Sequence, residues 1–253
     1  MPRFKLTIEY AGTRYSGWQI QKNARTVQGE IDRAARSVTG RKDFELYGAG
    51  RTDAGVHALA QVAHLDVSTQ LPAETLRRRL NDELPADINI LAATVVPHRF
   101  HARHDAVARR YLYQIARRRT AFAKAFVWWV RDPIDVARMR EAAVTFVGMR
   151  DFKAFAASAS RDDGDEPPPS TLVLVDRVED GALVLVAVEG SHFLWKMVRR
   201  MVGFLVEIGR GEAPPKDPAR HTAPPSGLFL ERVYYKGDPR DEPVRAANKV
   251  LGF

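Results

Sequence analysis

Alternating apolar and polar residues predict most of the strands of this chain. The first case is clear: Phe4, Leu6, Ile8 and Tyr10 alternate with polar residues, which is the period of a strand buried on one face. Similar short runs, bounded by turn residues, predict further strands. They cover residues 44–47, 61–67, 88–96, 111–115, 171–178, 182–188 and 229–235. The two runs on either side of Glu179-Asp180-Gly181 are expected to pair as a hairpin.

Apolar residues that recur every three or four positions predict four helices. These helices cover residues 26–38, 72–84, 134–147 and 192–209. The first has a suitable N-cap in Thr26 and a glycine at position 40 to end it. The second has Pro72 in its first turn and stops at Pro85.

Strands and helices mix without a strict strand–helix–strand alternation, which predicts the α+β class with mixed or antiparallel sheets. The second part of the chain repeats this order of elements without repeating the sequence. We therefore expect two halves, residues 1–106 and 107–253, that meet in a cleft. Residues 161–170 are acidic and contain three consecutive prolines, so they are expected to form an exposed loop.

Composition excludes several classes of protein. The chain has 253 residues, 45% of them apolar and 28% charged, which suits a globular protein with a substantial core. Its longest clear apolar run, 182–188, has seven residues, whereas a membrane span needs roughly 18. No secretory signal precedes the first strand. Cysteine is absent, which excludes disulfides, thiolate zinc sites and thiol nucleophiles. We expect a cytoplasmic protein without a membrane partner.

The charge balance indicates a class of partner. Lys+Arg is 39 and Asp+Glu is 31, so the formal charge is +8, and 30 of the 39 cations are arginine. Arginine meets phosphate bidentately and stacks on bases, which favours a nucleic-acid partner. A genome that favours arginine codons explains the same excess, so composition alone leaves both interpretations open.

The strongest candidate for chemistry is the stretch Gly48–His57, GAGRTDAGVH, with three glycines in eight residues. It fails as a dinucleotide fingerprint because Asp53 stands where the third glycine would be, and it lacks the ending of a phosphate-binding loop. Two interpretations remain. In one, an Arg51–Asp53 salt bridge staples a turn. In the other, Arg51 keeps Asp53 ionised, and the carboxylate is a nucleophile or general base.

Cations and aromatic rings also alternate in Arg109–Tyr113, and three arginines follow at 117–119. This pattern is typical of an RNA-binding surface, or of a strand with core tyrosines and a solvated basic turn. Arg199 and Arg200 lie inside the apolar helix predicted over 192–209. At least one must approach a core or cleft, where a guanidinium requires a carboxylate or phosphate partner.

The histidines do not indicate a metal site. Residues 98, 101 and 104 are histidines, but their spacing does not place all three on one helical face, so no metal is expected there. His57 and His64 are interpreted as structural residues.

The stretch Gly48–His57 resembles the signature of the TruA family of tRNA pseudouridine synthases. Other segments resemble blocks of that family, in the same order along nearly the whole chain. They are Tyr10–Gln19, Thr26–Gln28, Leu80–Ile88, Phe100–Arg103, Arg110–Tyr113, Asp151-Phe152, Phe193–Arg199 and Pro224–Leu228. Two departures occur: Arg150 replaces a histidine that often precedes Asp-Phe, and 161–169 replaces a polar stretch. Both could alter tRNA contacts, and neither touches the aspartate motif.

The resemblance implies a fold, an activity and roles for four residues. The fold is that of the pseudouridine synthases, with two α/β halves flanking a basic active-site cleft. By this resemblance Asp53 is the catalytic nucleophile, Tyr111 stacks on the target base, Arg199 pairs with the aspartate, and Arg51 helps to draw the nucleotide out of the stack. The first half, 1–106, then carries the aspartate loop, and the second half, 107–253, carries the tyrosine strand and the arginine helix.

The resemblance also implies the partners. The expected substrate is tRNA, with uridines at positions 38, 39 and 40 of the anticodon stem-loop as targets. The expected assembly is a homodimer, and the isomerisation requires no cofactor and no metal. Two rival classes remain: a hydrolase that uses Asp53 and His57, and an RNA-binding module without enzymatic activity.

Overall fold

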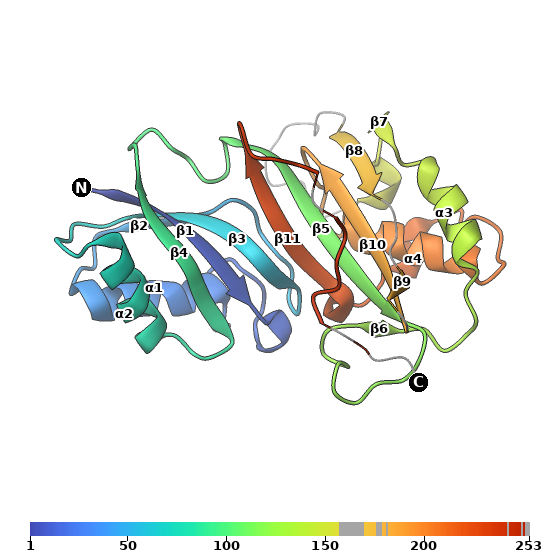
Figure 1. Ribbon diagram of the computed structural model, residues 1–253, viewed down its shortest axis with the longest axis horizontal. Helices are drawn as coiled ribbons and strands as arrows, with labels where there is room; N and C mark the ends of the chain where they lie inside the picture. The colour runs from blue at the N-terminus through green and yellow to red at the C-terminus, as the bar shows by residue number, and fades with distance from the viewer. Residues whose placement is uncertain (157–169, 176–178, 181, 242, 249, 251–253) are drawn as a thin grey trace. The chain divides into compact units, whose positions relative to one another are not determined.

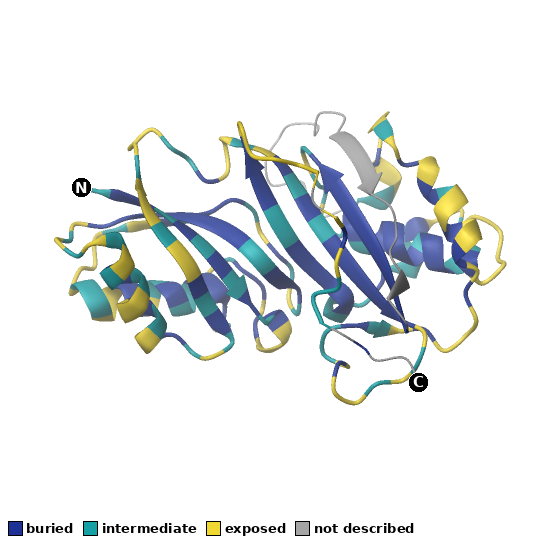
Figure 2. Ribbon diagram, viewed as in Figure 1, coloured by how far each residue is buried: buried dark blue, intermediate teal, exposed yellow. Residues whose placement is uncertain are grey.

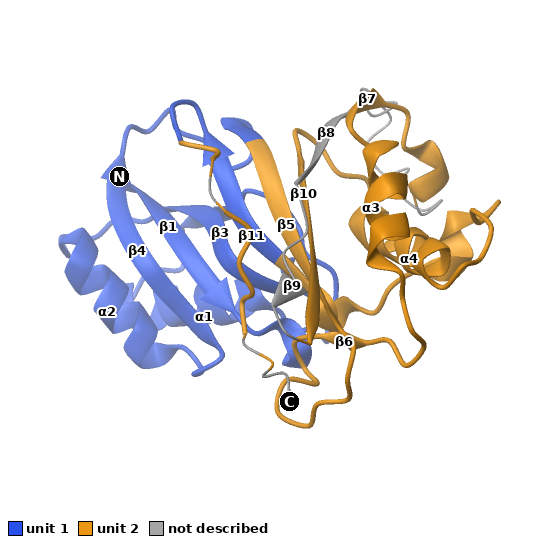
Figure 3. Ribbon diagram, turned by 45° about the vertical axis from the view of Figure 1, so that its right-hand side comes forward, with its two compact units in different colours: residues 1–107, 230–238 blue, residues 108–229, 239–253 orange. Residues whose placement is uncertain are grey.

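The computed structural model describes residues 1–156, 170–175, 179–180, 182–241, 243–248 and 250. Residues 161–169 of the loop predicted over 161–170 lie outside the described residues, as does Gly181 of the predicted hairpin turn, and Ser170 begins a strand rather than ending a loop. The chain forms two compact units (Figure 3). Unit 1 contains residues 1–107 and 230–238, and unit 2 contains residues 108–229 and 239–253.

Unit 1 contains five strands of a larger sheet, whose path is drawn in Figure 1. In order across the sheet they are β4 (Ile88–Val96), β1 (Arg3–Tyr10), β3 (His57–Asp66) and β11 (Leu228–Tyr235), with β2 (Glu45–Gly48) also paired to β3. Strand β1 pairs antiparallel with both β3 and β4. Its register against β3 runs from Arg3↔Asp66 to Tyr10↔Ala58 and shifts between Ile8 and Tyr10.

Two helices, α1 (Val27–Thr39) and α2 (Ala73–Glu83), pack against each other in unit 1. The Oγ1 of Thr26 accepts a hydrogen bond from the backbone N–H of Gly29 at 3.2 Å, so Thr26 is the predicted N-cap. At the other end Gly40 has φ +67°, the left-handed conformation that ends a helix. The side chains of α1 that face the core are completely or almost completely buried (Figure 2).

Unit 2 is also a sheet with helices. Its main path is β5 (Ala106–Ala116), β10 (Leu183–Gly190), β8 (Ser170–Val175) and β7 (Gly148–Arg150), with antiparallel pairing throughout. Strand β6 (Trp128–Trp129) pairs parallel with β5, and β9 (Glu179–Asp180) pairs antiparallel with β10. All eight residues of β10 are buried, so this strand is central to the core (Figure 2).

The helices of unit 2 are α3 (Val136–Val144) and α4 (Met197–Gly209), which pack against each other. Four short 3₁₀ helices complete the chain: η1 (Gly12–Arg14), η2 (Lys153–Phe155), η3 (Pro218–His221) and η4 (Pro225–Gly227). None of the helices in the described ranges combines the length and the apolar character that a membrane span requires.

The α+β class with mixed and antiparallel pairing, predicted from the order of elements, is confirmed. Several predicted boundaries were wrong. Helix α4 begins at Met197 and not at 192, because Lys196 has φ +60° and interrupts helical geometry. Strand β3 begins at His57, four residues earlier than predicted, and helix α3 covers 136–144 rather than 134–147.

Candidate active site

Asp53 lies in a tight turn between β2 and β3 of unit 1. Its carbonyl oxygen accepts a hydrogen bond from the backbone N–H of Val56 at 3.1 Å. Gly55, the third residue of this turn, has φ +79°, a conformation that side chains disfavour. Asp53 is half-buried and Arg51 is exposed. The turn therefore presents the carboxylate from a connection with a defined backbone shape.

Residues 10–18, here called the bracing segment, hold this turn through backbone contacts. The N–H of Trp18 donates to the carbonyl of Thr52 at 3.1 Å, and the N–H of Gly55 donates to the carbonyl of Tyr15 at 3.2 Å. These two bonds bracket Asp53 on both sides along the chain. Main-chain atoms are placed by the fold rather than by flexible rotamers, so they limit how far the aspartate can move.

Glycines make this close approach possible. A Cβ atom on Gly12 would lie 1.9 Å from the carbonyl oxygen of Val56, and one on Gly17 would lie 2.5 Å from that of Thr52. Gly48, at the end of β2, lies against the indole of Trp18, where a Cβ would come within 2.6 Å of the ring. At each of these positions a side chain would displace backbone or a packed ring. The glycines at 12 and 17 therefore serve the aspartate loop.

Buried polar side chains fasten the same loop. The hydroxyl groups of Tyr10 and Thr52 form a buried hydrogen bond of 2.8 Å. Gln61, which is completely buried on β3, donates from Nε2 to the carbonyl of Gly50 at 3.0 Å. Leaving either partner of such a bond without the other would cost about 1–3 kcal/mol. The loop is thus fixed from β1 and from β3.

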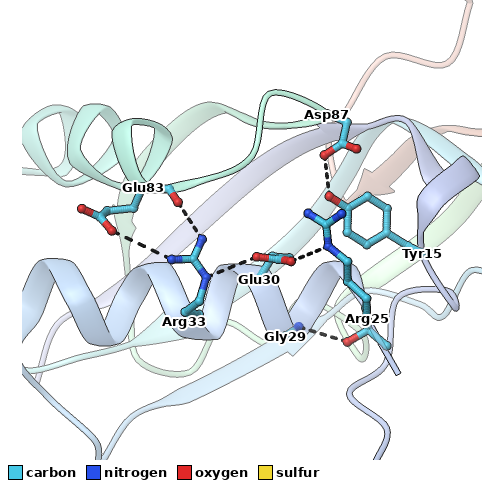
Figure 4. Close-up of polar contacts among 8 residues, drawn as sticks. Tyr15, Arg25, Gly29, Glu30, Arg33, Glu83 and Asp87 are labelled. Atoms are coloured by element: carbon cyan, nitrogen blue, oxygen red, sulfur yellow. Dashed lines mark hydrogen bonds and ion pairs between the residues drawn. The ribbon is translucent and has the colours of Figure 1, made fainter. Parts of the chain in front are cut away.

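Tyr15 connects the bracing segment to a network of charges (Figure 4). Its hydroxyl donates to Asp87 at 2.5 Å, and the guanidinium of Arg25 lies over its ring at 4.8 Å from the centroid. Glu30 accepts from both Arg25 and Arg33, at 2.6 and 3.3 Å. Burial and the bond to Asp87 raise the pKa of Tyr15 well above its ordinary value. Tyr15 therefore stays protonated and is a donor at every physiological pH.

His57 has a structural role, as predicted. It is almost completely buried, and its Nδ1 accepts a hydrogen bond from the N–H of Gly12 at 3.0 Å. An accepting Nδ1 carries no proton, so the ring is neutral with its proton on Nε2. This geometry opposes the hydrolase interpretation, in which His57 works with Asp53. The structure gives little support to the interpretation in which an Arg51–Asp53 salt bridge stabilises the turn. Arg51 is exposed, and a solvated ion pair contributes little stability.

Tyr111 lies on β5 of unit 2, opposite Val188 of β10. It is half-buried, and its ring packs edge-on against Phe193 with centroids 4.9 Å apart and an interplanar angle of 75°. The neighbouring Tyr113 is completely buried and donates its hydroxyl to the carbonyl of Pro224 at 2.7 Å. Of the two tyrosines, only Tyr111 retains an accessible surface for a ligand.

Arg199 lies in the first turn of α4 and is half-buried. Its Nε donates to the carbonyl of Ala223 at 2.7 Å, and the N–H of Ala223 donates back to the carbonyl of Arg199 at 3.0 Å. This reciprocal pair fixes the guanidinium relative to the segment after η3. Arg200 is more deeply buried, with 8% exposure, and within the described part of the chain its Nε and Nη1 have no hydrogen-bond partner. Nothing in the described structure explains why Arg200 is buried without partners for these two nitrogen atoms.

His64, His101 and His104 form an aromatic cluster with Tyr47. The rings of His64 and His101 lie 4.8 Å apart, those of His101 and His104 lie 4.1 Å apart, and Tyr47 stacks on His64. His98 points elsewhere, with its Nε2 3.5 Å from a carboxylate oxygen of Asp66. In the described ranges no three His, Cys, Asp or Glu side chains are placed to hold a metal ion.

Of the four predicted site residues, Arg51 and Asp53 share one loop in unit 1, whereas Tyr111 and Arg199 lie in unit 2. The bracing segment lies within the block Tyr10–Gln19 that carries part of the family resemblance. The sequence did not predict that this segment holds the aspartate loop. One available signal was the pair of glycines at 12 and 17, which flank aromatic residues immediately after a strand. Their partners are distant in sequence, so their purpose is visible only in the fold.

Comparison with known proteins identifies the family to which this chain is similar. The family model for tRNA pseudouridine synthase matches residues 6–105 and 142–236. A tRNA pseudouridine synthase A of Rhodopseudomonas palustris (strain BisA53) is 42% identical over 93% of this chain and 100% of its own length. The protein of the same name from Limosilactobacillus fermentum is 40% identical over 98% of this chain and 100% of its own. That of Geobacter sp. (strain M21) is 40% identical over 93% and 99%.

These matches cover most of the chain and include both the aspartate loop and the helix with Arg199. The resemblance inferred from the sequence motifs is confirmed, and with it the pseudouridine synthase fold. The chain therefore belongs to the tRNA pseudouridine synthase family, the isomerases that act on uridine in tRNA.

Proposed function

We propose that this enzyme converts uridine to pseudouridine at positions 38, 39 and 40 of the anticodon stem-loop of tRNA, with Asp53 as the nucleophile. The observation that supports this most directly is the placement of Asp53. The turn that carries it is bonded on both sides to the bracing segment by main-chain groups. A carboxylate held in this way can attack a bound nucleotide with little loss of conformational freedom.

The chemistry explains why a carboxylate is needed. The N1–C1′ bond of the nucleotide breaks, the uracil turns, and a C5–C1′ bond forms. The C5 proton leaves and N1 gains a proton, so the atoms of substrate and product are the same. The carboxylate adds either to C6 of the uracil or to C1′ of the ribose, and this covalent link keeps the fragments together. The isomerisation is neutral in electrons, so these residues act without a cofactor or a metal.

The other three residues assist at the nucleotide. The half-buried ring of Tyr111, supported edge-on by Phe193, offers a face for stacking on the target base. Arg199, fixed by the carbonyl of Ala223, supplies the cation that pairs with the aspartate. Arg51 is exposed beside Asp53 and helps to extrude the nucleotide from the helical stack. In this proposal all four residues act on one bound nucleotide.

We further propose that the enzyme works as a homodimer in the cytoplasm, with tRNA as its partner. The formal charge of +8 supports binding to an anionic RNA, whose phosphates attract Lys and Arg.

Release of tritium tests the reaction. Purified enzyme is incubated with tRNA that carries tritium at C5 of its uracils. The proposed isomerisation exchanges that hydrogen, so label enters the solvent, and replacement of uridines 38, 39 and 40 by cytidine should abolish the release. A hydrolase would instead cleave a bond with the C5 label retained, and a binding module would release nothing.

A further inference from the structure

We propose that residues 117–131 of unit 2 form a second RNA-contacting surface, which stacks an unpaired base between cations. The surface consists of six exposed side chains, here called the basic–aromatic patch: Arg117, Arg119, Phe122, Lys124, Trp129 and Arg131. This inference rests on the proposed function, since it assigns a further part of the tRNA contact. None of these six residues belongs to the four predicted site residues.

The two aromatic rings of the patch are presented to solvent. Phe122 has 101% relative exposure, the highest among the exposed large apolar residues of the described chain, and Trp129 has 42%. Rings this exposed have a free face on which an unpaired base can stack. The connection that carries these rings is largely exposed or half-buried between β5 and β6 (Figure 2).

The exposed rings are carried by a fixed backbone. Strand β6 pairs with the end of β5, Ile115 with Trp128 and Ala116 with Trp129. The carbonyl of Phe126 accepts from the buried Gln114 at 2.9 Å, and that of Val127 accepts from Ser226 at 3.1 Å. The tip is closed by the N–H of Ala123, which donates to Thr120 Oγ1 at 3.3 Å. Phe122 is therefore held outward by ordered structure on both sides.

The charges around the rings identify the partner as an anion. The patch contains four cations, and the guanidinium of Arg119 lies 5.8 Å from the centroid of the Trp129 ring. The segment 117–135 contains only two acidic residues. Asp132 is paired with Arg210 at 3.2 Å, and Asp135 caps α3 by accepting from Ala137 and Arg138. The excess of positive charge beside exposed rings fits phosphates and bases.

The position along β5 connects the patch to the reaction. Tyr111 and Ala116 are five residues apart on one strand, which is about 17 Å at roughly 3.4 Å per residue. One tRNA whose target base lies at Tyr111 can therefore also reach the patch. The patch would then add affinity through stacking and phosphate contacts that are independent of the target base.

Substitution of Phe122 tests the stacking. Phe122→Ala together with Trp129→Ala should weaken the dissociation constant for full-length tRNA by about 10- to 100-fold, and the decrease in pseudouridine formation should be overcome by more enzyme. Phe122→Leu keeps the apolar bulk and should weaken binding, whereas Phe122→Trp should retain it. Phe122 is fully exposed, so these single variants should fold. Val144→Ala, an exposed apolar residue on α3, is the matched control and should bind as wild type.

Salt dependence tests the cations. The double change of Arg119→Gln and Lys124→Gln should reduce the slope of log K against log salt by about 0.7–0.9 for each phosphate that the variant no longer neutralises. Wild-type affinity in the variant that combines Phe122→Ala and Trp129→Ala would overturn the proposal. So would a Phe122→Leu variant that binds as tightly as wild type, or variants that sediment as a smaller species, because the patch would then join two copies. The proposed isomerisation is judged separately, by tritium release from the wild type.

Discussion

The Asp53 loop of unit 1 and the Tyr111 strand of unit 2 hold their functional groups in different ways. The loop is fixed by main chain: two backbone hydrogen bonds from the bracing segment, and glycines where no side chain would fit. Tyr111 and Arg199 are held through side-chain contacts, among them an edge-on phenylalanine and one carbonyl. In the proposed site, main chain thus positions the nucleophile, whereas side chains, which can adjust as the base turns, position the groups expected to receive it.

Among changes that leave the four proposed site residues in place, the largest effect is expected from crowding the loop. Gly12→Ala places a Cβ 1.9 Å from the carbonyl oxygen of Val56, so the backbone at the aspartate must shift. A displacement of about 1 Å can cost 10²-fold in rate, and we expect pseudouridine formation to fall by at least that factor. Overpacking of about 1–3 kcal/mol should also lower Tm by several degrees.

Gly50→Ala is the matched control for folding. No atom lies within 4 Å of the position where its Cβ would be, so its Tm should stay within about 2 °C of wild type. Wild-type rates in Gly12→Ala would show that the backbone of the loop tolerates displacement. The aspartate loop would then be no more rigidly held than Tyr111 and Arg199.

Tyr111 is the corresponding test in unit 2, with a smaller expected effect. Tyr111→Phe keeps the stacking face and removes a hydroxyl that we expect to carry the C5 proton, so the single-turnover rate should fall by about 10²-fold with tRNA binding intact. Tyr111→Ala removes ring and hydroxyl and should also weaken binding. A Phe variant as fast as wild type would exclude the hydroxyl from proton transfer.

Acid should weaken unit 1 through His64, a buried residue of β3. Burial and the nearby Arg3 guanidinium lower the pKa of His64 to about 4, so the folded state binds fewer protons than the unfolded state, whose imidazole pKa is about 6.5. The free energy of unfolding should therefore fall as pH decreases from 6.5 to 4, by up to about 3 kcal/mol.

Chemical denaturation at several pH values measures this decrease. His64→Gln should flatten the slope between pH 4 and 6.5. An unchanged slope in His64→Gln would assign the acid sensitivity to another group, such as His101, whose pKa is also lowered by burial and by the neighbouring His104. The hydrogen bond and ion pair with Arg3 hold the pKa of Asp66 below its ordinary value against the opposing effect of burial, so its contribution belongs to lower pH.

The smallest effect is expected from the buried hydroxyl pair under the loop. Thr52→Val leaves the hydroxyl of Tyr10 without its 2.8 Å partner and should lower the free energy of unfolding by about 1–3 kcal/mol. In the double variant with Tyr10→Phe both polar groups are gone, so the decrease should be smaller than the sum of the two single decreases. Additive decreases in this double-mutant cycle would mean that the bond does not hold the loop.

The sequence predicted elements with local signals better than it predicted long-range contacts. Helix α1 begins after Thr26 and ends before Gly40, as these two residues predict, because capping depends on local sequence. The predicted start of α4 was wrong because the apolar periodicity continues N-terminal to the helix. The positive φ of Lys196 interrupts helical geometry there. Strand β3 was predicted too short because its first four residues do not alternate between buried and exposed positions.

The same distinction applies to the site. Asp53 stood out by its glycine-rich surroundings, and the family motifs suggested roles for Tyr111 and Arg199. The contacts of Gly12 and Gly17 with residues 52–56 join segments more than 30 residues apart, and no local pattern encodes them.

The proposed covalent attack by Asp53 can be tested with a single substitution. Asp53→Asn keeps the shape of the side chain and removes the nucleophilic oxygen charge. We predict no tritium release or pseudouridine from labelled tRNA, with a dissociation constant within a few fold of wild type, since affinity depends on phosphate contacts. Turnover above a few per cent of the wild-type rate would exclude Asp53 as the nucleophile.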